Sequence, residues 1–124
     1  MKNAVSWFEI PAADLKRAKN FYESVFQIQM HEMTLGNGLK MALFPVQNGT
    51  VGGALCEHPR FYLPGHEGTL VYLNANPDLE LILDRIRALG GKALIPKTQI
   101  SPERGHMALF EDSEGNRVAL HSAM

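Results

Sequence analysis

The feature that most constrains this chain is an internal repeat. The tetrapeptide Met-Ala-Leu-Phe at 41–44 recurs at 107–110, an offset of 66 residues. Gly49 and Gly115 keep that offset, and each follows its phenylalanine by five residues. Self-similarity at a fixed spacing indicates that one supersecondary unit has been used twice. The chain is therefore predicted to fold as two copies of one unit.

An amphipathic helix is predicted at the matching place in each half. In the first half, apolar residues follow Asp14 at helical spacing, and a carboxylate there can accept hydrogen bonds from the free amides of a helix N-terminus. The second half repeats this pattern behind Asp78, and Gly90 and Gly91 mark the end of its helix. The predicted apolar faces are Leu15, Ala18, Tyr22, Val25 and Phe26 in the first helix, and Leu79, Ile82, Leu83, Ile86 and Leu89 in the second. The repeat therefore extends over both halves of the chain.

Short runs rich in aromatic and β-branched residues surround both helices and predict strands. The predicted strands are 4–10, 28–34, 39–44 and 51–56 in the first half, and 69–74, 93–97, 106–110 and 117–122 in the second. This order predicts an α+β fold in which a βαβββ module occurs twice. We expect one domain made of a first module at 1–58, a proline- and glycine-containing linker at 59–67 and a second module at 68–124. The polar segment 97–104 is long enough to act as a lid.

The balance of charges excludes several classes of partner. The chain has twelve Lys and Arg residues and thirteen Asp and Glu residues, so neither a basic surface nor a nucleic-acid partner is expected. The longest uncharged stretch, 41–56, is interrupted by a proline and several glycines, so no membrane partner is expected. The single cysteine, Cys56, cannot form an internal disulfide, which favours a cytoplasmic location.

A duplicated βαβββ module of this size resembles the vicinal oxygen chelate superfamily, which includes glyoxalase I, bleomycin resistance proteins and extradiol dioxygenases. The resemblance is carried by Asp-Leu-Lys-Arg-Ala at 14–18, Phe-Tyr at 21–22 and Phe-Glu-Asp-Ser-Glu-Gly-Asn at 110–116. Trp-Phe-Glu-Ile-Pro at 7–11 and Leu-His-Ser at 120–122 are similar to a bacterial branch related to lactoylglutathione lyase. The resemblance implies a U-shaped mixed sheet around a cavity for a small-molecule ligand, and a homodimer.

Metal-binding members of this family place one ligand on the first and on the fourth strand of each module. Carried over to this sequence, the four positions are Trp7, Gly53 or Ala54, Leu70 or one of its two neighbours, and Ala119. Catalytic divalent metals take about three ligands from His, Cys, Asp and Glu, and none of these positions offers one. We therefore expect neither a metal at the familiar place nor any other cofactor.

A step of two residues along a strand returns to the same face of the sheet. From the four carried-over positions, this step reaches four titratable side chains: Glu9, Cys56, Tyr72 and His121. One hypothesis is a displaced catalytic layer in which Glu9 is the general base and His121 or Tyr72 supplies a proton. The protein would then be a glyoxalase-like lyase or isomerase acting on a small carbonyl compound. The same side chains could instead bind an off-register divalent metal.

The substrate-binding residues expected around this layer are Trp7, Cys56, Arg117 and His106. The alternative function is non-catalytic binding of a drug or toxin, as in antibiotic-resistance relatives. Structural roles are a further alternative: Glu9 could pair with Arg117 or His121, since a buried carboxylate needs a partner, and Cys56 could be a small buried apolar residue. The sequence leaves these alternatives open.

Overall fold

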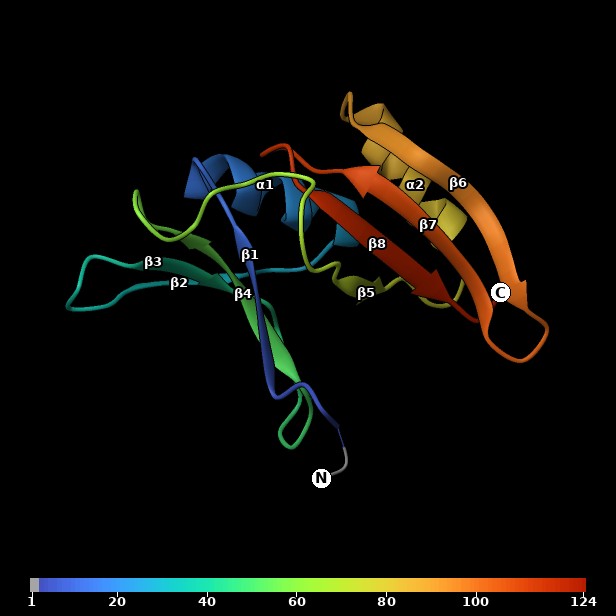
Figure 1. The fold of residues 1–124 in the computed structure, drawn as a ribbon, viewed down its shortest axis with the longest axis horizontal. Coiled ribbons are helices and arrows are strands. Elements are labelled where there is room, and N and C mark those ends of the chain that lie inside the picture. Colours follow the sequence, from blue (N-terminus) through green and yellow to red (C-terminus); the bar gives the residue numbers. More distant parts are fainter. Residues whose placement is uncertain (1–2) are drawn as a thin grey trace.

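The computed structural model describes residues 3–124 and contains two βαβββ modules (Figure 1). The first module consists of β1 (Trp7–Pro11), α1 (Leu15–Phe26), β2 (His31–Thr34), β3 (Lys40–Leu43) and β4 (Gly52–Glu57). The second consists of β5 (Tyr72–Asn74), α2 (Leu79–Ala88), β6 (Lys92–Ser101), β7 (Gly105–Glu111) and β8 (Arg117–Ser122). The predicted α+β class and the two modules are confirmed.

The strands form two four-stranded mixed sheets. The first sheet has the order β1-β4-β3-β2 and the second has the order β5-β8-β7-β6. β1 is parallel to β4 and β5 is parallel to β8, whereas the other neighbours are antiparallel. The U-shaped sheet expected from the resemblance is thus divided between two sheets within this chain, and β1 and β5 are edge strands.

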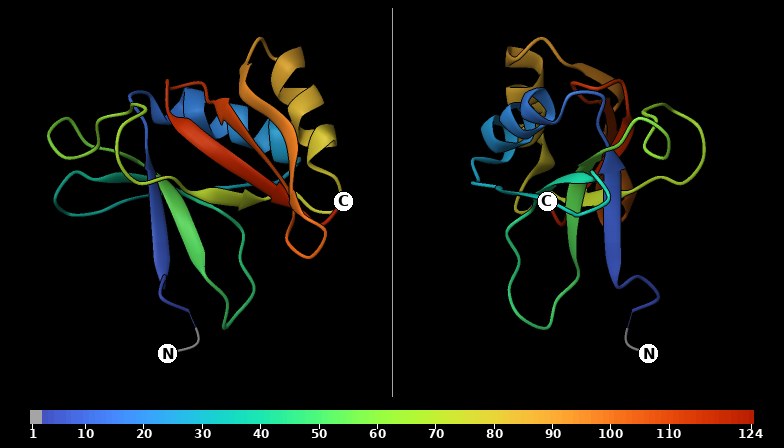
Figure 2. Two further views of the ribbon diagram at one scale, coloured as in Figure 1. Left: turned by 45° about the vertical axis from the view of Figure 1, so that its right-hand side comes forward. Right: turned by 90° about the vertical axis from the view of Figure 1, so that its left-hand side faces the viewer.

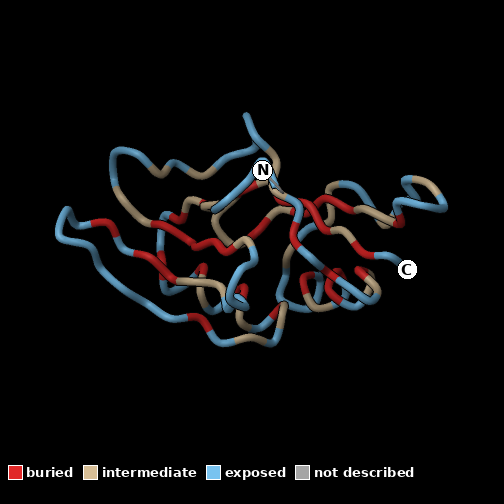
Figure 3. Tube along the Cα trace, turned by 90° about the horizontal axis from the view of Figure 1, so that it is seen from below, coloured by how far each residue is buried: buried red, intermediate tan, exposed pale blue. Residues whose placement is uncertain are grey.

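One apolar core joins the two modules. It contains residues from both helices and from the helix-facing side of both sheets. The rings of Phe21 in α1 and Phe110 in β7 are stacked, with their centroids 6.3 Å apart. In Figure 3 the buried stretches alternate with exposed ones along the chain, and most of the connecting segments are exposed. In Figure 2 the helices lie together, and β1 and β4 project away from them.

The turn between β7 and β8 connects the second module to the start of α1. The buried carboxylate of Glu114 accepts hydrogen bonds from the backbone N–H groups of Ala13 and Asp14, at 2.9 and 2.8 Å. It also accepts from Nε of Arg17 at 2.8 Å. The amide of Asn116 donates to the carbonyl oxygen of Pro11 at 2.7 Å. This turn therefore supports a helix N-terminus in the other module.

Both helices begin where they were predicted to begin, behind Asp14 and Asp78. The predicted lid is wrong, because β6 continues to Ser101 and pairs with β7 through Thr98 and Met107. Three strands begin about three residues later than predicted, at Trp7, His31 and Tyr72. Among the described residues, neither helix is long and apolar enough to cross a bilayer.

Candidate functional site

In each sheet one face packs against the helices, and we call the opposite side the outer face. On β1, Phe8 and Ile10 belong to the helix-facing core or pack on it, so Trp7 and Glu9 lie on the outer face. On β4, Ala54 and Cys56 lie on the outer face, where they form a small separate cluster with side chains of β3. The same alternation places Tyr72, Arg117, Ala119 and His121 on the outer face of the second sheet.

The four carried-over ligand positions lie on these outer faces. Gly53 is excluded as the β4 position because it belongs to the helix-facing side, where an added Cβ would lie 2.3 Å from the ring of Phe8. The positions are therefore Trp7, Ala54, Leu70 and Ala119. An indole and three aliphatic side chains do not fit a divalent metal. Within residues 3–124, no group of three or more His, Cys, Asp or Glu side chains could hold an ion.

The structure places three of the predicted site residues together on the first sheet. The carboxylate of Glu9 accepts hydrogen bonds from the hydroxyl of Tyr62 at 2.6 Å and from Nε1 of Trp7 at 3.2 Å. Burial, together with the nearby carboxylate of Glu9, raises the pKa of Cys56 to about 12. Its thiol is therefore protonated at neutral pH and is a poor nucleophile. The hydrogen bond to Glu9 raises the pKa of Tyr62 to about 12 as well.

Tyr62 is the residue of this cluster that sequence reasoning missed. It belongs to the segment between the modules and packs on the outer-face cluster of the first sheet. A lone aromatic residue in a proline-containing linker has no periodicity that would assign it to a face. Glu9 pairs with neither Arg117 nor His121 among the described residues, so the ion pairs considered for it from the sequence are not found.

The other predicted site residues belong to the second sheet. Nε2 of His121 lies 2.6 Å from the carbonyl oxygen of Arg104, to which it donates. Nη2 of Arg117 donates to the carbonyl oxygen of Gly68 at 2.6 Å, and Arg117 lines a pocket of about 570 Å³ beneath the linker. Tyr72 is half exposed. His106 shares the helix-facing side of β7 with Ala108. Tyr72 lines one pocket together with Glu9, and Arg117 lines the smaller pocket together with Glu9, whereas His106 and His121 line neither.

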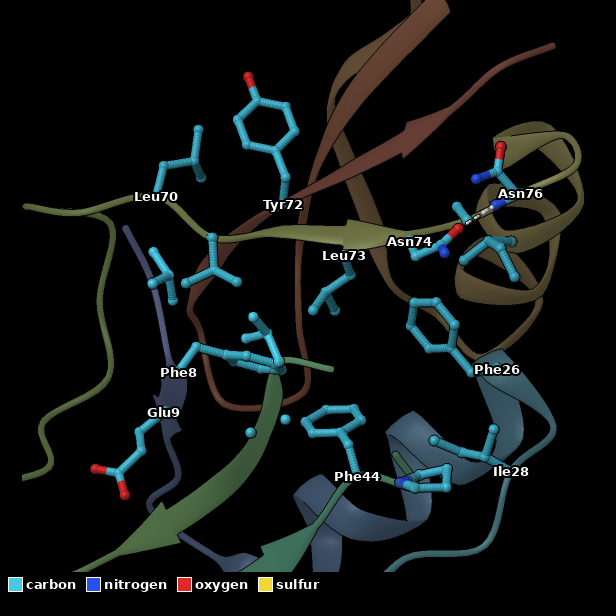
Figure 4. Close-up of a pocket in the computed structure, with 18 of the residues that line it drawn as sticks. Phe8, Glu9, Phe26, Ile28, Phe44, Leu70, Tyr72, Leu73, Asn74 and Asn76 are labelled. Carbon is cyan, nitrogen blue, oxygen red and sulfur yellow. Dashed lines mark hydrogen bonds between the residues drawn. The ribbon is translucent and has the colours of Figure 1, made fainter. Parts of the chain in front are cut away.

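A groove of about 1140 Å³ lies between the two modules (Figure 4). We call it the inter-module groove. Phe8, Phe44, Phe26 and Ile28 form its floor on the side of the first module, and Leu73 of β5 points toward them. Phe8 and Phe44 are in contact, with ring centroids 5.5 Å apart. Apolar grooves of this kind are the usual form of small-molecule sites in proteins.

Two consecutive glycines of β4 make this floor possible. Gly52 pairs with Trp7 and Gly53 pairs with Phe8 in the register of β1 and β4. A Cβ at Gly52 would lie 3.1 Å from the indole, and one at Gly53 would overlap the phenyl ring. The missing side chains let the two rings lie flat on opposite faces of the sheet. The predicted site residues Trp7, Glu9 and Tyr72 line the groove. Sequence reasoning missed its floor of phenylalanines, because these residues come from separate elements.

The groove has polar residues at the end formed by α2. Oδ1 of Asn74 accepts from the backbone N–H of Asn76 at 2.9 Å. The carboxylate of Asp78 accepts from Nζ of Lys97 at 2.9 Å, and this hydrogen bond lowers the pKa of Asp78. Arg85 also lines the groove there. The groove thus combines an aromatic floor with a polar end.

Both the sequence and the fold are similar to those of known proteins. A family model described as Glyoxalase/Bleomycin resistance protein/Dioxygenase superfamily matches residues 4–120. No curated protein matches the sequence. A glyoxylase/bleomycin resistance protein/dioxygenase domain from Frankia sp. EAN1pec has a similar structure, with a TM-score of 0.72, 17% identity and coverage of 98% of both chains.

Two further structures are similar in fold. TnmS3, an antibiotic binding protein from Streptomyces sp. CB03234, has a TM-score of 0.67 and 22% identity, and the match covers 97% of this chain and 95% of that one. Glyoxalase I from Zea mays has a TM-score of 0.67 and 16% identity, and the match covers 95% of this chain and 44% of that one. At these identities the likeness shows a shared fold.

Proposed function

Since the chain belongs to the Glyoxalase/Bleomycin resistance protein/Dioxygenase superfamily, we propose that it binds a small, flat, apolar organic molecule in the inter-module groove without converting it. The observation that carries this proposal is the aromatic floor formed by Phe8, Phe26 and Phe44. Aromatic rings offer large apolar area in a defined geometry, and a planar ligand gains both burial and stacking on them. The similar fold of an antibiotic binding protein supports the same reading.

Binding without turnover fits the distribution of titratable groups. Glu9 and Cys56 are on the first sheet, whereas Tyr72 and His121 are on the second, and the hydrogen bonds of Glu9 and His121 go to other residues. General acid–base catalysis needs both groups within hydrogen-bond reach of one substrate. Of the four groups, Glu9 and Tyr72 line the groove, whereas Cys56 and His121 are not among its lining residues.

Binding can be tested with N-phenylnaphthylamine, a neutral aromatic dye whose fluorescence rises in apolar sites. Trp7 is the only tryptophan of the chain and lines the groove, so energy transfer from it to the dye reports occupancy. We expect Phe8→Ala to weaken dye binding by about tenfold, since it removes the central ring of the floor. Phe61→Ala is the matched control, because Phe61 is 76% exposed and lies outside the groove. Unchanged affinity in a Phe8→Ala variant with native circular dichroism would contradict the proposal.

A lyase or isomerase acting on a small carbonyl compound is the second candidate. It is favoured by the position of Glu9, which borders both the groove and the smaller pocket. A panel of small aldehydes and ketones incubated with the protein and followed by NMR would test it. Turnover that Glu9→Gln abolishes would establish this candidate and overturn binding alone.

We also propose that the protein is a homodimer. β1 and β5 each have one free edge among the described strands, and Val5 and Trp7 expose about half of their surface beside β1. Unpaired edges with apolar side chains favour association. Light scattering after size exclusion should give twice the mass of 13.8 kDa, and a mass of 13.8 kDa would exclude the dimer. The cytoplasmic location inferred from the lone Cys56 stays a prediction.

A further inference from the structure

We propose that Arg85 makes the inter-module groove selective for organic anions, so that its ligand is a flat apolar molecule bearing a carboxylate or a sulfonate. This inference rests on the proposed binding function and adds the chemical class of the ligand. The inference depends on one observation: the guanidinium of Arg85 lies at the polar end of an aromatic groove and has no ion-pair partner among the described residues.

Arg85 reaches the groove from α2. Its Nη1 donates to the carbonyl oxygen of Val25 at 3.1 Å. Val25 precedes Phe26, whose ring belongs to the floor, so this bond holds the guanidinium beside the apolar surface. A guanidinium has five N–H donors. Within residues 3–124, the guanidinium of Arg85 makes this one hydrogen bond, and no carboxylate forms an ion pair with it.

The other charges that line the groove are already compensated or turned away. Besides Arg85 these are Asp78 and Glu9. Asp78 is bound by Lys97 at 2.9 Å and by the backbone N–H of Glu80 at 3.0 Å. Glu9 points away from the aromatic floor and accepts from Tyr62 (Figure 4). A ligand in the groove therefore meets one uncompensated charge, and it is positive.

A planar guanidinium matches a carboxylate or sulfonate, because two N–H groups can donate side by side to two oxygens. A neutral ligand would cover Arg85 and leave its donors without water or a partner, which costs binding free energy. An anionic group on the ligand removes this cost and adds a charge-assisted hydrogen bond. The groove should therefore discriminate between two ligands that share an aromatic framework and differ in one anionic group.

Two dyes provide that comparison. Anilinonaphthalenesulfonate carries a sulfonate, whereas N-phenylnaphthylamine has the same aromatic framework without it. We expect Arg85→Gln to weaken the binding of the sulfonate dye by about tenfold or more and to leave the neutral dye within about twofold. Arg87→Gln is the matched control. It removes the same charge from the same helix, but Arg87 is at the surface, where it pairs with Glu80 and Asp84 at 3.4 Å.

The outcomes separate this inference from the proposed function. If Arg85→Gln and Arg87→Gln weaken the binding of the sulfonate dye equally, the role of Arg85 is overturned and groove binding stays intact. The same holds if only Arg117→Gln, a change in the smaller pocket, weakens it. Failure of both dyes to accept energy from Trp7 in the unmodified protein would overturn the proposed function and this inference together. If dye affinity falls as the protein concentration rises, a second copy of the chain competes with the dye for the groove. This result would also overturn the proposed role of Arg85.

Discussion

Glu114 shows how one side chain can connect two modules. Its carboxylate is buried against the start of α1, where it accepts from the Asp14 N–H and from Arg17. Burial favours the protonated form, but the hydrogen bonds from Arg17 and from the Asp14 N–H outweigh it and hold the pKa of Glu114 below its ordinary value of 4.5. The ionised form is thus the one that the folded state stabilises. A carboxylate at a helix N-terminus also interacts favourably with the helix dipole.

Replacing Glu114 with Gln should lower the free energy of unfolding by about 1 to 2 kcal/mol at pH 7, because an uncharged amide loses the charge-assisted part of these hydrogen bonds. The pKa of Glu114 is lower in the folded state than in the unfolded state. Its contribution is therefore present above pH 4.5 and is lost as the pH falls through the folded pKa. Urea unfolding at several pH values should show that the difference in free energy of unfolding between the two proteins becomes smaller in acid. A difference that stays constant below pH 4 would contradict this account.

Gly53 is a second residue at which a small change should have a specific effect. An added Cβ would lie 2.3 to 2.4 Å from the ring of Phe8, so the ring must move. Gly53→Ala should cost about 1 to 3 kcal/mol of stability and weaken dye binding, because the displaced ring enters the inter-module groove. Gly36→Ala is the control, since nothing lies within 4 Å of its Cβ position, and its effect should stay within about 0.5 kcal/mol. Thermal unfolding and dye titration measure both effects, and equal behaviour of the two variants would refute the prediction.

At the scale of single residues, the sequence predicts what depends on neighbours along the chain. Asp14 and Asp78 were found because a cap precedes a periodic apolar face by a fixed spacing. The bond between Tyr62 and Glu9 joins residues 53 positions apart, and no local pattern specifies it. Arg85 was missed for a similar reason. Its position on α2 is predictable, but its role depends on the carbonyl of Val25, 60 positions away.

The segment between the modules acts as a structural element although it contains no helix or strand. Tyr62 packs on the outer face of the first sheet beside Met41, Ala54 and Cys56. Farther along, the carbonyl of Gly65 accepts from the backbone N–H of Arg117 at 3.2 Å. The segment therefore covers one sheet and contacts the first residue of β8 in the other.

Tyr62→Phe tests this attachment. The variant loses the hydroxyl that donates to Glu9, and we expect it to be about 1 kcal/mol less stable at pH 8. The pKa of Tyr62 is raised from 10.0 to about 12. The stabilisation by the Tyr62 hydroxyl is therefore fully present below pH 10 and is lost as the pH rises through about 12. The difference in free energy of unfolding between the two proteins should become smaller over this range. Guanidinium unfolding at pH 8 and pH 11 measures it. Identical stability at pH 8 would mean that the hydroxyl contributes nothing.

At the scale of elements, sequence patterns found both helices and all eight strands, but they placed three strand starts about three residues early and ended β6 too soon. β6 was predicted to end at 97, and the residues after it were assigned to a lid. In the structure its second half pairs with β7, although the register shifts between Ile95 and Thr98 and again between Gln99 and Ser101. Such irregularities interrupt strict alternation. The second half of an exposed edge strand is also polar, and both properties resemble those of a loop.

At the scale of the whole molecule, the internal repeat predicts two equivalent modules but not how they pack. Module orientation depends on contacts between distant residues, such as the stacked rings of Phe21 and Phe110. In this chain the helix-facing sides of both sheets share one core, and the outer faces of the sheets do not contribute to it. The polar residues predicted for one layer are divided between the two sheets, although Glu9 and Tyr72 both line the groove where the modules meet. The family resemblance correctly predicts the two modules, and the location of the site stays a prediction.

A shared core implies that the two modules unfold together. The hydroxyl of Tyr22 in the first module donates to the carboxylate of Asp112 in the second at 2.8 Å. Burial raises the pKa of Tyr22 well above its usual value, so this hydroxyl keeps its proton. Tyr22→Phe leaves the buried carboxylate of Asp112 with one donor fewer, which should cost about 2 kcal/mol. Tyr72→Phe is the control, because Tyr72 is half exposed and makes no side-chain hydrogen bond among the described residues.

In urea, the fluorescence of Trp7 reports the first module, and hydrogen exchange of residues 105–122 reports the second. If the core is shared, both probes give one midpoint in the unmodified protein. Tyr22→Phe then lowers both midpoints by the same amount, although only one module carries the substitution. Two separate transitions, or a shift confined to the first module, would mean that each module is stable alone. The shared core would then contribute little to cooperativity, and the inter-module groove would lie between two independently folding units.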